Sequence, residues 1–512
     1  MTMTRRYLLA VASAALLAAS SSSVFAADRG GTLTVARPDE PLTLDPFIPS
    51  DNGSIYAIAQ ICESLVSPDQ AGTGLEPGLA ESWEVSDDGL TYIFKLRDGI
   101  KFSDGTPVTV EDAIFSLGKV SNPEAAYGFA FADVTGLEKT DDGRFKVTLS
   151  KPNAAILSAM SLFSAAIVSK AAYEADPDGF GTKPVCTGPF MVESYERGAE
   201  LVLVPNPNYW EMGEDGKPLP YVEKAVLKYV PESNSRVLGL QNGDFDVILS
   251  VPLSQAASLG SDGTNTLEVS PSYRLDYVYL NHAKAPLDDK NIRLALNYAT
   301  NHEAIMKAVY FGYGETPNSF MPKVNYWSED VELIPYDVEK AKELVAASDY
   351  DGTPIQLMVD TGNAPSRQIA TILEQGWAEA GLKVEITEAD VGTAFGTVEK
   401  GDYQAYVSYI TSDINDSDEL ATLQADYTGA TNAFFSWYKN DKVVDLLGQA
   451  RATSDTAERA ALYKEIQDIV YHDGYSVPLN FLPYVAAYGP QVKDWKTITV
   501  GWWWLKDVSL AP

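Results

Sequence analysis

Residues 79–115 constrain the fold of this chain more than any other segment. Polar and apolar side chains alternate over residues 91–96, which is the period of a half-buried β-strand. Turn sequences with glycine lie on both sides of this stretch, and Thr109 with Asp112 has the spacing of a capping box. The segment therefore predicts a strand, a turn and an amphipathic helix in this order.

The remaining sequence predicts a mixed α/β protein with more than one domain. Strand patterns dominate the first half of the chain, and residues 502–510 also have a strand pattern. In the second half, helical periodicity over residues 366–380 lies between apolar strands at 355–359 and 383–386, which is typical of an α/β lobe. A chain of 512 residues is also too long for one hydrophobic core.

The first 26 residues have the pattern of an export signal. Arg5 and Arg6 precede an apolar run at residues 7–17 that is too short to span a bilayer. Val24-Phe25-Ala26 has the small-residue pattern of a cleavage site. We expect residues 1–26 to be a signal peptide, cleaved near Ala26 on export to the periplasm. The arginine pair fits the twin-arginine route as well as an ordinary Sec leader.

Charge and motifs exclude several classes of function. The net charge of −33 opposes binding to nucleic acids and anionic membranes, although it also suits a cationic ligand. The three histidines, His282, His302 and His472, lack the spacing of a metal site. Ser116-Leu117-Gly118-Lys119 and Ser50-Asp51-Asn52 match two motifs of penicillin-binding enzymes, but in reverse order and without the third motif. We expect no catalytic site, cofactor or metal; a secreted hydrolase is the alternative from another class.

The letters of the opening segment, WEVSDDGLTYIFKLR followed by GIKFSDGTPVTVEDA, resemble the solute-binding proteins of ABC importers for peptides, nickel and opines. These proteins are solute-binding family 5. Further similarity lies at residues 189–210, 277–298, 336–344 and 466–479. Because several dispersed matches occur in one order, the resemblance is more specific than a single motif and covers nearly the whole mature chain.

The resemblance implies a two-lobed periplasmic-binding-protein fold of class II type, with a hinge between the lobes. The first lobe would comprise residues 27–272, with an extra subdomain at about 66–180. The second lobe would comprise residues 273–485, and residues 486–512 would return to the first lobe. The ligand would lie between the lobes.

The resemblance also implies an anchor for the ligand. In peptide-binding members, an aspartate at the position that matches Asp413 pairs with the ligand's α-ammonium group, which is a charge-assisted hydrogen bond. The tryptophan common before it is replaced by Ile410, and a solvated acidic loop or a helix cap is the alternative role. Asp360 stands near the place of the arginine that holds a dipeptide's carboxylate. Arg367 is the candidate to replace that arginine, unless it lies on the outer face of its helix.

Aromatic side chains would cover the apolar part of the ligand. The candidates are Tyr127, Tyr273, Trp437, Trp502 and Trp504. Consecutive tryptophans in a strand point to alternate faces, so one face would line the cleft, or these residues would pack within the lobe.

Cys62 and Cys186 are the only cysteines. In an oxidising compartment two cysteines most simply form one disulfide bond, and two buried free thiols are the alternative. The family usually has glycine at the position of Cys186, and this departure favours the Cys62–Cys186 bond.

We therefore expect the periplasmic substrate-binding component of an ABC importer. It would bind an oligopeptide or a peptide-like amine by hinge closure. It would be a monomer that delivers this ligand to an inner-membrane permease with ATPase subunits. An opine, a sugar or a metal chelate is the alternative ligand on the same fold.

Overall fold

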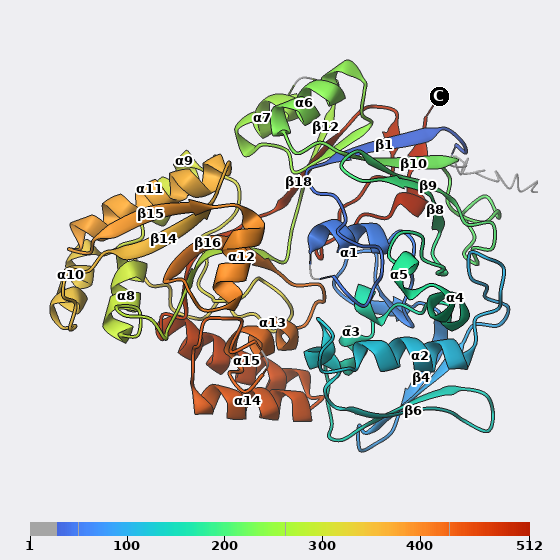
Figure 1. The fold of residues 1–512 in the computed structure, drawn as a ribbon, viewed down its shortest axis with the longest axis horizontal. Helices are drawn as coiled ribbons and strands as arrows, with labels where there is room; N and C mark the ends of the chain where they lie inside the picture. The colour runs from blue at the N-terminus through green and yellow to red at the C-terminus, as the bar shows by residue number, and fades with distance from the viewer. Residues whose placement is uncertain (1–27, 50, 262, 430, 512) are drawn as a thin grey trace, which may run out of the picture.

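The computed structural model describes residues 28–49, 51–261, 263–429 and 431–511. The export signal expected at residues 1–26 lies outside these ranges. Within them, no helix combines the length and the hydropathy that a membrane crossing requires. Two lobes lie side by side, with most of the chain up to residue 270 in one and residues 274–481 in the other (Figure 1).

A mixed sheet of seven strands forms the centre of the first lobe. β1 lies in its middle and pairs in parallel with β10 and β11. In spatial order the strands are β12 (Thr266–Ser270), β18 (Tyr484–Tyr488), β11 (Val247–Leu249), β1 (Thr32–Arg37), β10 (Lys224–Tyr229), β9 (Glu200–Pro205) and β8 (Phe190–Glu196). The helices near this sheet are α1 (Asn52–Ile58), α6 (Ser233–Asn242) and α7 (Leu253–Ser261).

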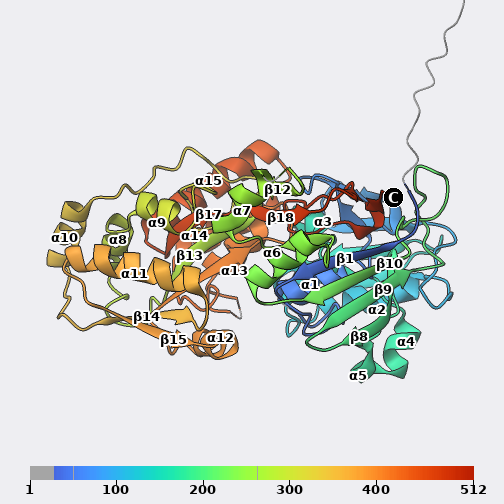
Figure 2. The same cartoon turned by 90° about the horizontal axis from the view of Figure 1, so that it is seen from above.

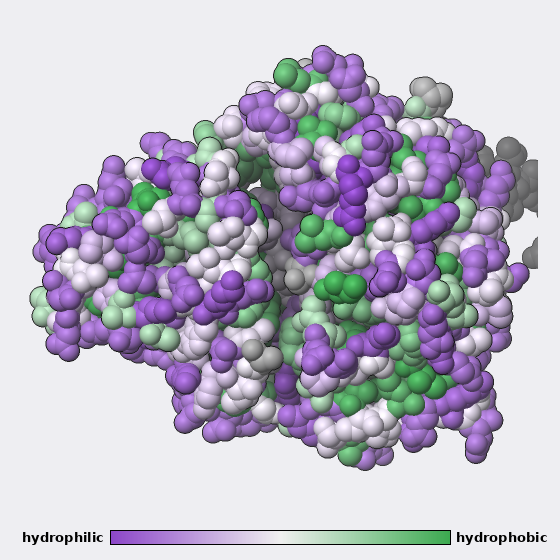
Figure 3. Space-filling model, viewed as in Figure 1, coloured by the Kyte–Doolittle hydropathy of each residue, from purple (hydrophilic) through white to green (hydrophobic). Residues whose placement is uncertain are grey.

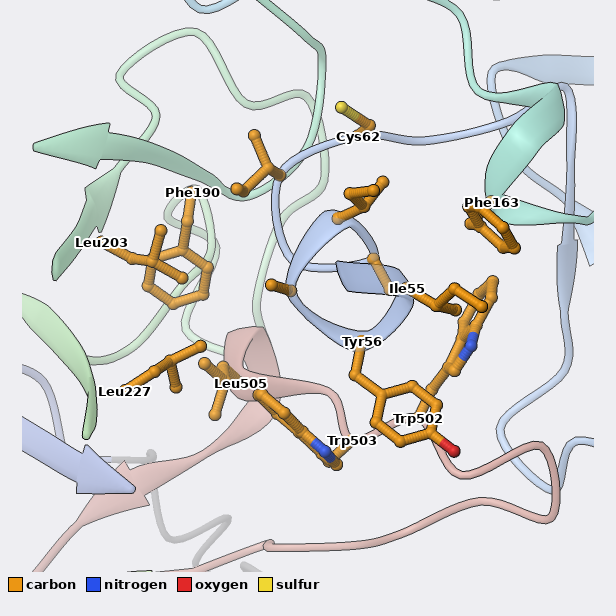
Figure 4. Packing of buried hydrophobic residues seen from close by; sticks show 14 of the residues in the cluster. Ile55, Tyr56, Cys62, Phe163, Phe190, Leu203, Leu227, Trp502, Trp503 and Leu505 are labelled. Carbon is orange, nitrogen blue, oxygen red and sulfur yellow. The ribbon is translucent and has the colours of Figure 1, made fainter. Parts of the chain in front are cut away.

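The core of the first lobe lies between α1 and this sheet. Phe190, Leu203 and Leu227 of the strands lie on one side of α1, whereas Ile55 of α1 points toward Phe163 on the other side (Figure 4). The C-terminal segment closes the same core with Trp502, Trp503 and Leu505. The strand predicted at residues 502–510 is wrong for the tryptophans. Trp503 forms only an isolated bridge to Thr497, and a short 3-10 helix follows at Leu505–Asp507.

An antiparallel sheet of four strands extends the first lobe, inside the range predicted for the extra subdomain. Its strands are β4 (Ala80–Val85), β5 (Thr91–Leu96), β7 (Phe145–Leu149) and β6 (Val134–Lys139). The remaining elements of this region are α2 (Val110–Val120), α3 (Ile156–Ala159), α4 (Lys170–Ala175), α5 (Pro177–Phe180), β2 (Val66–Pro68), β3 (Leu75–Pro77) and 3-10 helices at Gly128–Phe131 and Phe163–Ala165. The predicted strand and capping box are confirmed, because Thr109 and Asp112 exchange both capping hydrogen bonds.

A sheet of five strands forms the centre of the second lobe. Its order is β15 (Val384–Ala389), β14 (Ile355–Asp360), β16 (Ala405–Thr411), β13 (Arg274–Leu280) and β17 (Ser476–Phe481). Val278 and Leu280 of β13 pack in one core cluster and Tyr277 and Tyr279 in another, because alternate side chains of a strand face opposite sides.

Helices cover both faces of this sheet (Figure 2). One face packs against α8 (Lys290–Tyr298), α9 (His302–Ala308), α10 (Val338–Ala346) and α11 (Ala364–Glu379). The other packs against α12 (Val391–Glu399), α13 (Ser417–Ala425), α14 (Asp441–Ala452) and α15 (Thr456–His472). The predicted α/β alternation of the second half is confirmed, with α11 between β14 and β15 in the sequence.

The chain crosses between the lobes twice, over very short segments. β12 ends at Ser270 and β13 begins at Arg274; β17 ends at Phe481 and β18 begins at Tyr484. β12 pairs with β18 in one sheet, and β13 pairs with β17 in the other. The two crossings therefore lie together. The return to the first lobe begins two residues before the limit predicted at 485/486, and we propose lobe boundaries at these crossings.

The disulfide bond between Cys62 and Cys186 is confirmed. Both residues are buried, Cys62 after α1 and Cys186 before β8. The bond closes a loop with a sequence separation of 124 that contains the four-stranded sheet. The short β19 (Val492–Lys493) and β20 (Ser509–Leu510) pair with each other near the C-terminus, in the first lobe.

Candidate ligand-binding site

The loop that follows β16, residues 412–416, connects the second lobe to the first. Ile414 is 4% exposed and packs in a core cluster whose other members all come from the first lobe. The side-chain amide of Asn415 donates to the carbonyl of Thr73 at 2.6 Å. A second bridge runs from the backbone amide of Ala154 to the carbonyl of Arg451 at 2.9 Å. The lobes are therefore in contact, as in a closed binding protein.

Glu419 of α13 fixes the shape of this loop. Its carboxylate accepts hydrogen bonds from the hydroxyl of Ser412 and from the backbone amides of Asp413 and Ile414. Asp416 begins α13 as its N-cap, with its side chain accepting from the amide of Asp418. The loop is thus held from both ends, and these hydrogen bonds fix the backbone at Asp413.

Asp413 presents a free carboxylate oxygen between the lobes. Its side chain is only 3% exposed, and Oδ2 accepts from the hydroxyl of Tyr127 in the first lobe at 2.6 Å. Oδ1 is buried and has no hydrogen-bond partner among the described residues. An unpaired buried acceptor is costly, so such an atom indicates a missing partner.

The electrostatics of this loop favour a cation. Burial raises the pKa of Asp413 to about 6, although the hydrogen bond from Tyr127 works in the opposite direction. Burial and the charge of Asp413 hold the pKa of Glu419 well above its ordinary value. No lysine or arginine in the described ranges forms an ion pair with either carboxylate. A bound cation would therefore relieve the cost of ionising Asp413.

Tyrosines from the first lobe surround this carboxylate. The hydroxyls of Tyr56 on α1 and Tyr484 on β18 lie 3.2 Å apart, and the charge of Asp413 helps to raise the pKa of both. The ring of Tyr127 stands edge-on to Phe163 at 5.0 Å. Gly501 has φ of +87°, and a Cβ there would lie 2.4 Å from the Tyr56 hydroxyl. Only glycine lets the backbone approach these phenols so closely.

Arg274 at the start of β13 lies within electrostatic reach of Tyr484, as Asp413 does, and was not among the candidates from the sequence. Its Nε donates to Asp276 at 2.6 Å, and its guanidinium lies 3.9 Å from the centre of the Tyr409 ring. Tyr409 is 41% exposed, although it belongs to a central strand. The sequence signal was weak: the only clue is the i, i+2 spacing of Arg274 and Asp276 in a strand pattern.

The structure brings Asp413 and Tyr127 together, and the side chains of three other candidates have different partners. Tyr273 is buried, with its hydroxyl on the carbonyl of Gly72. Arg367 is exposed on α11 and pairs with Glu388. Trp437 packs over Gly401, before β16, whereas Asp413 follows that strand; a strand of this length separates them by about 20 Å.

Trp502 and Trp504 line a cavity of about 170 Å³ within the first lobe. Glu63 also lines it and accepts from the Tyr209 hydroxyl at 3.0 Å and the Trp210 indole at 3.1 Å. Burial raises the pKa of Glu63 to about 7. Phe163 forms part of the wall and separates the cavity from Tyr127. The two tryptophans thus line this cavity of the first lobe, and their contact with a ligand stays a prediction.

A hollow runs between the lobes on the face shown in Figure 3. Within the described ranges, no group of three or more His, Cys, Asp or Glu side chains is arranged to hold a metal ion. His282 and His302 are half-buried, and each ring has a nitrogen within hydrogen-bond distance of a backbone carbonyl.

Comparisons with known proteins found a family match and a similar protein over most of the chain. A family model described as bacterial extracellular solute-binding proteins, family 5 Middle, matches residues 74–432, more than half of the chain. The glutathione-binding protein GsiB of Escherichia coli O1:K1 / APEC is 30% identical over 480 residues, which cover 92% of this chain and 91% of that protein.

Two solved structures have the same fold over nearly the whole chain. The periplasmic binding protein DppA from Helicobacter pylori, in complex with the peptide STSA, matches with a TM-score of 0.86 and 27% identity, covering 95% of this chain and 99% of that one. AgaA from A. tumefaciens R10, in complex with agropinic acid, matches with a TM-score of 0.85 and 25% identity, covering 94% of this chain and 99% of that one.

Proposed function

Because this chain belongs to the bacterial extracellular solute-binding proteins of family 5, we propose that it carries an oligopeptide or a peptide-like amine to an ABC permease. Proteins of this family are the substrate-binding components of ABC importers rather than enzymes. The family and the two-lobed α/β fold were both expected from the sequence. The ligand class, the permease with its ATPase subunits and the monomeric state belong to the proposal.

One observation supports a ligand with an amino group. Asp413 is buried between the lobes with an oxygen that has no partner among the described residues. An ammonium group that enters with the ligand would satisfy this oxygen and neutralise the carboxylate at once. Charge-assisted hydrogen bonds of this kind are short and strong in a site that excludes water. The DppA structure, which contains a peptide, supports the same class of ligand.

Closure of the lobes gives the proposed transport cycle. Tyr127 belongs to the first lobe and Asp413 to the second, so a ligand bound between them stabilises the closed form. A ligand shifts such an equilibrium only by its difference in affinity for the two forms. The closed form would then present the ligand to the permease. We also propose that residues 1–26 direct export and are cleaved near Ala26.

Thermal unfolding of the refolded, ligand-free protein tests this function. The panel contains the peptide Ser-Thr-Ser-Ala, glutathione, agropinic acid, a sugar and a nickel–histidine chelate. A ligand at 100 to 1,000 times its dissociation constant adds about 2.7–4.1 kcal/mol of stability. We expect the peptide or another amine to raise the Tm, and Asp413→Asn to abolish that increase. This variant keeps an oxygen for the Tyr127 hydroxyl.

Asp441→Asn is the matched control, because Asp441 also accepts from a tyrosine hydroxyl but lies exposed on α14. It should leave the shift intact. A shift by the sugar alone, or by an amine in Asp413→Asn, would contradict the proposed ligand class.

A further inference from the structure

We propose that Arg274 binds the carboxylate of the ligand, so that the ligand is a zwitterion held at both ends by the second lobe. This rests on the proposed function, in which Asp413 binds the ammonium group. Arg274 would fill the role that the sequence assigned to Arg367. Arg274 begins β13, and Asp413 lies in the loop directly after the neighbouring strand β16, which limits the spacing of the two anchors.

The register of the sheet places both anchors at one edge. In the antiparallel pair of β13 and β16, Arg274 lies opposite Thr411. Asp413 lies two residues beyond Thr411 and Arg274 begins its strand, so both face the first lobe. Tyr484 of the first lobe is within electrostatic reach of both, since the Arg274 charge lowers and the Asp413 charge raises the pKa of its hydroxyl.

Neighbouring side chains hold the guanidinium of Arg274 in place, but they do not use all of its hydrogen-bond donors. Asp276 binds Nε and is itself fixed by the hydroxyl of Tyr310 at 3.0 Å. Tyr409 covers one face of the guanidinium plane. The two terminal nitrogens have no hydrogen-bond partner among the described residues, and 28% of the side chain is exposed. A planar fork with two free nitrogens matches a carboxylate.

The positions of the other charges support this assignment. Arg367 pairs with Glu388 on the outer face of α11. Arg451 and Arg459 are buried in pairs with Asp418 and Asp416. Arg274 thus combines a position at the lobe interface with free donors, and it stands beside an exposed aromatic ring on the same sheet face.

Binding of three forms of one probe tests the proposal on the unmodified protein. The probe is the tetrapeptide Ser-Thr-Ser-Ala, compared with its C-terminal amide and its N-acetyl form by calorimetry at pH 7.5. A lost charge-assisted hydrogen bond at either end should weaken binding about 10–100-fold. We expect both modified forms to bind more weakly than the free peptide.

Variants then assign each end to its residue. Arg274→Gln should remove the preference for the free acid over the amide but keep the preference for the free amine. Asp413→Asn should do the reverse. Arg144→Gln is the matched control, because Arg144 also pairs with an aspartate two residues away, but directly before β7 of the four-stranded sheet. It should keep both preferences.

The outcomes separate this inference from the proposed function. Equal binding of acid and amide by the unmodified protein, with the amine preference retained, would overturn the role of Arg274 alone. Loss of the acid preference in Arg367→Gln instead of Arg274→Gln would do the same. No binding of any of the three forms would overturn both proposals. Because the first comparison needs no variant, a failure of Arg274→Gln to fold leaves the test decisive.

Discussion

Asp413 and Glu419 form a pair of carboxylates that folding buries together at considerable cost. Ser412, Asp413 and Ile414 donate to Glu419, so this side chain acts as a brace for the loop. The pKa of Asp413 is raised to about 6. The two carboxylates therefore differ. Hydrogen bonds fix the Glu419 carboxylate as part of the structure, and the Asp413 carboxylate keeps one oxygen available for a partner.

Ligand affinity should therefore depend on pH below about 6. In the proposed function the ionised form of Asp413 binds an ammonium group, and its raised pKa of about 6 means that protonation would compete with the ligand as the pH falls. Below that pKa the affinity should fall by up to about tenfold per pH unit. Calorimetric titration of a peptide amine at pH 7.5, 6 and 5 measures this.

The comparison variant is Asp413→Asn, which cannot ionise. Its weak affinity should stay constant over the same pH range. A wild-type affinity that is unchanged between pH 7.5 and 5 would contradict ammonium binding at Asp413.

Single side chains show how much of the candidate site could be predicted from the sequence. The resemblance to a known family identified Asp413 because a short ordered motif carries it. Arg274 was not a candidate from the sequence, because its proposed role depends on the register of β13 and β16 and on the crossing between lobes, neither of which a local pattern contains. Trp437 was chosen by residue type and Arg367 by its position a few residues after Asp360; in the structure Trp437 packs over Gly401 and Arg367 pairs with Glu388.

Helices and strands form where local chemistry and packing agree. α2 begins at a reciprocal capping box, and β5 alternates buried and exposed side chains. Both were predictable, because caps and periodicity act over a few residues. The prediction of a strand around Trp502 was wrong, because burial in a core does not require strand geometry. Gly501 has a positive φ and turns the chain there, and the tryptophans fill the core from a coil.

Removal of the cap on α2 should cost measurable stability. Thr109→Ala loses the side-chain bonds to Asp112 at the N-terminus of the helix. We expect a decrease of about 1 kcal/mol in the free energy of unfolding. Urea denaturation of the mature protein measures the change.

Thr109→Ser keeps the hydroxyl and should lose only a few tenths of that amount. Equal losses in Thr109→Ala and Thr109→Ser would mean that the methyl group, rather than the cap, stabilises the helix.

The whole molecule is a pair of lobes whose relative position depends on few contacts. Two short crossings join the sheets, and the loop after β16 holds the lobes together through Ile414 and Asn415. The sequence could predict two lobes only through its resemblance to a known family. It could not predict which residues bridge them, because these contacts join segments about 340 positions apart, as between Asn415 and Thr73.

Shortening Ile414 should open the molecule. Ile414→Ala removes about 2–5 kcal/mol of packing from the closed form, because its side chain is buried among residues of the other lobe. We expect a larger radius of gyration in small-angle X-ray scattering of the ligand-free protein, and a return toward the compact value when ligand is added.

Ile305→Ala is the matched control, since Ile305 is fully buried inside the second lobe's own core. It should lower the stability of the fold without a change in scattering. Identical scattering profiles for the two variants would argue against Ile414 as a latch.

The disulfide bond affects what happens to the exported protein when a protease cuts it. Every peptide bond between Cys62 and Cys186 lies within one covalent ring, which carries the whole four-stranded sheet. A protease that cuts a turn of that sheet therefore releases no fragment. The nicked protein would migrate as one band on a denaturing gel and separate into pieces only after reduction. The bond thus keeps a damaged receptor in one piece, with both halves of its first lobe still attached.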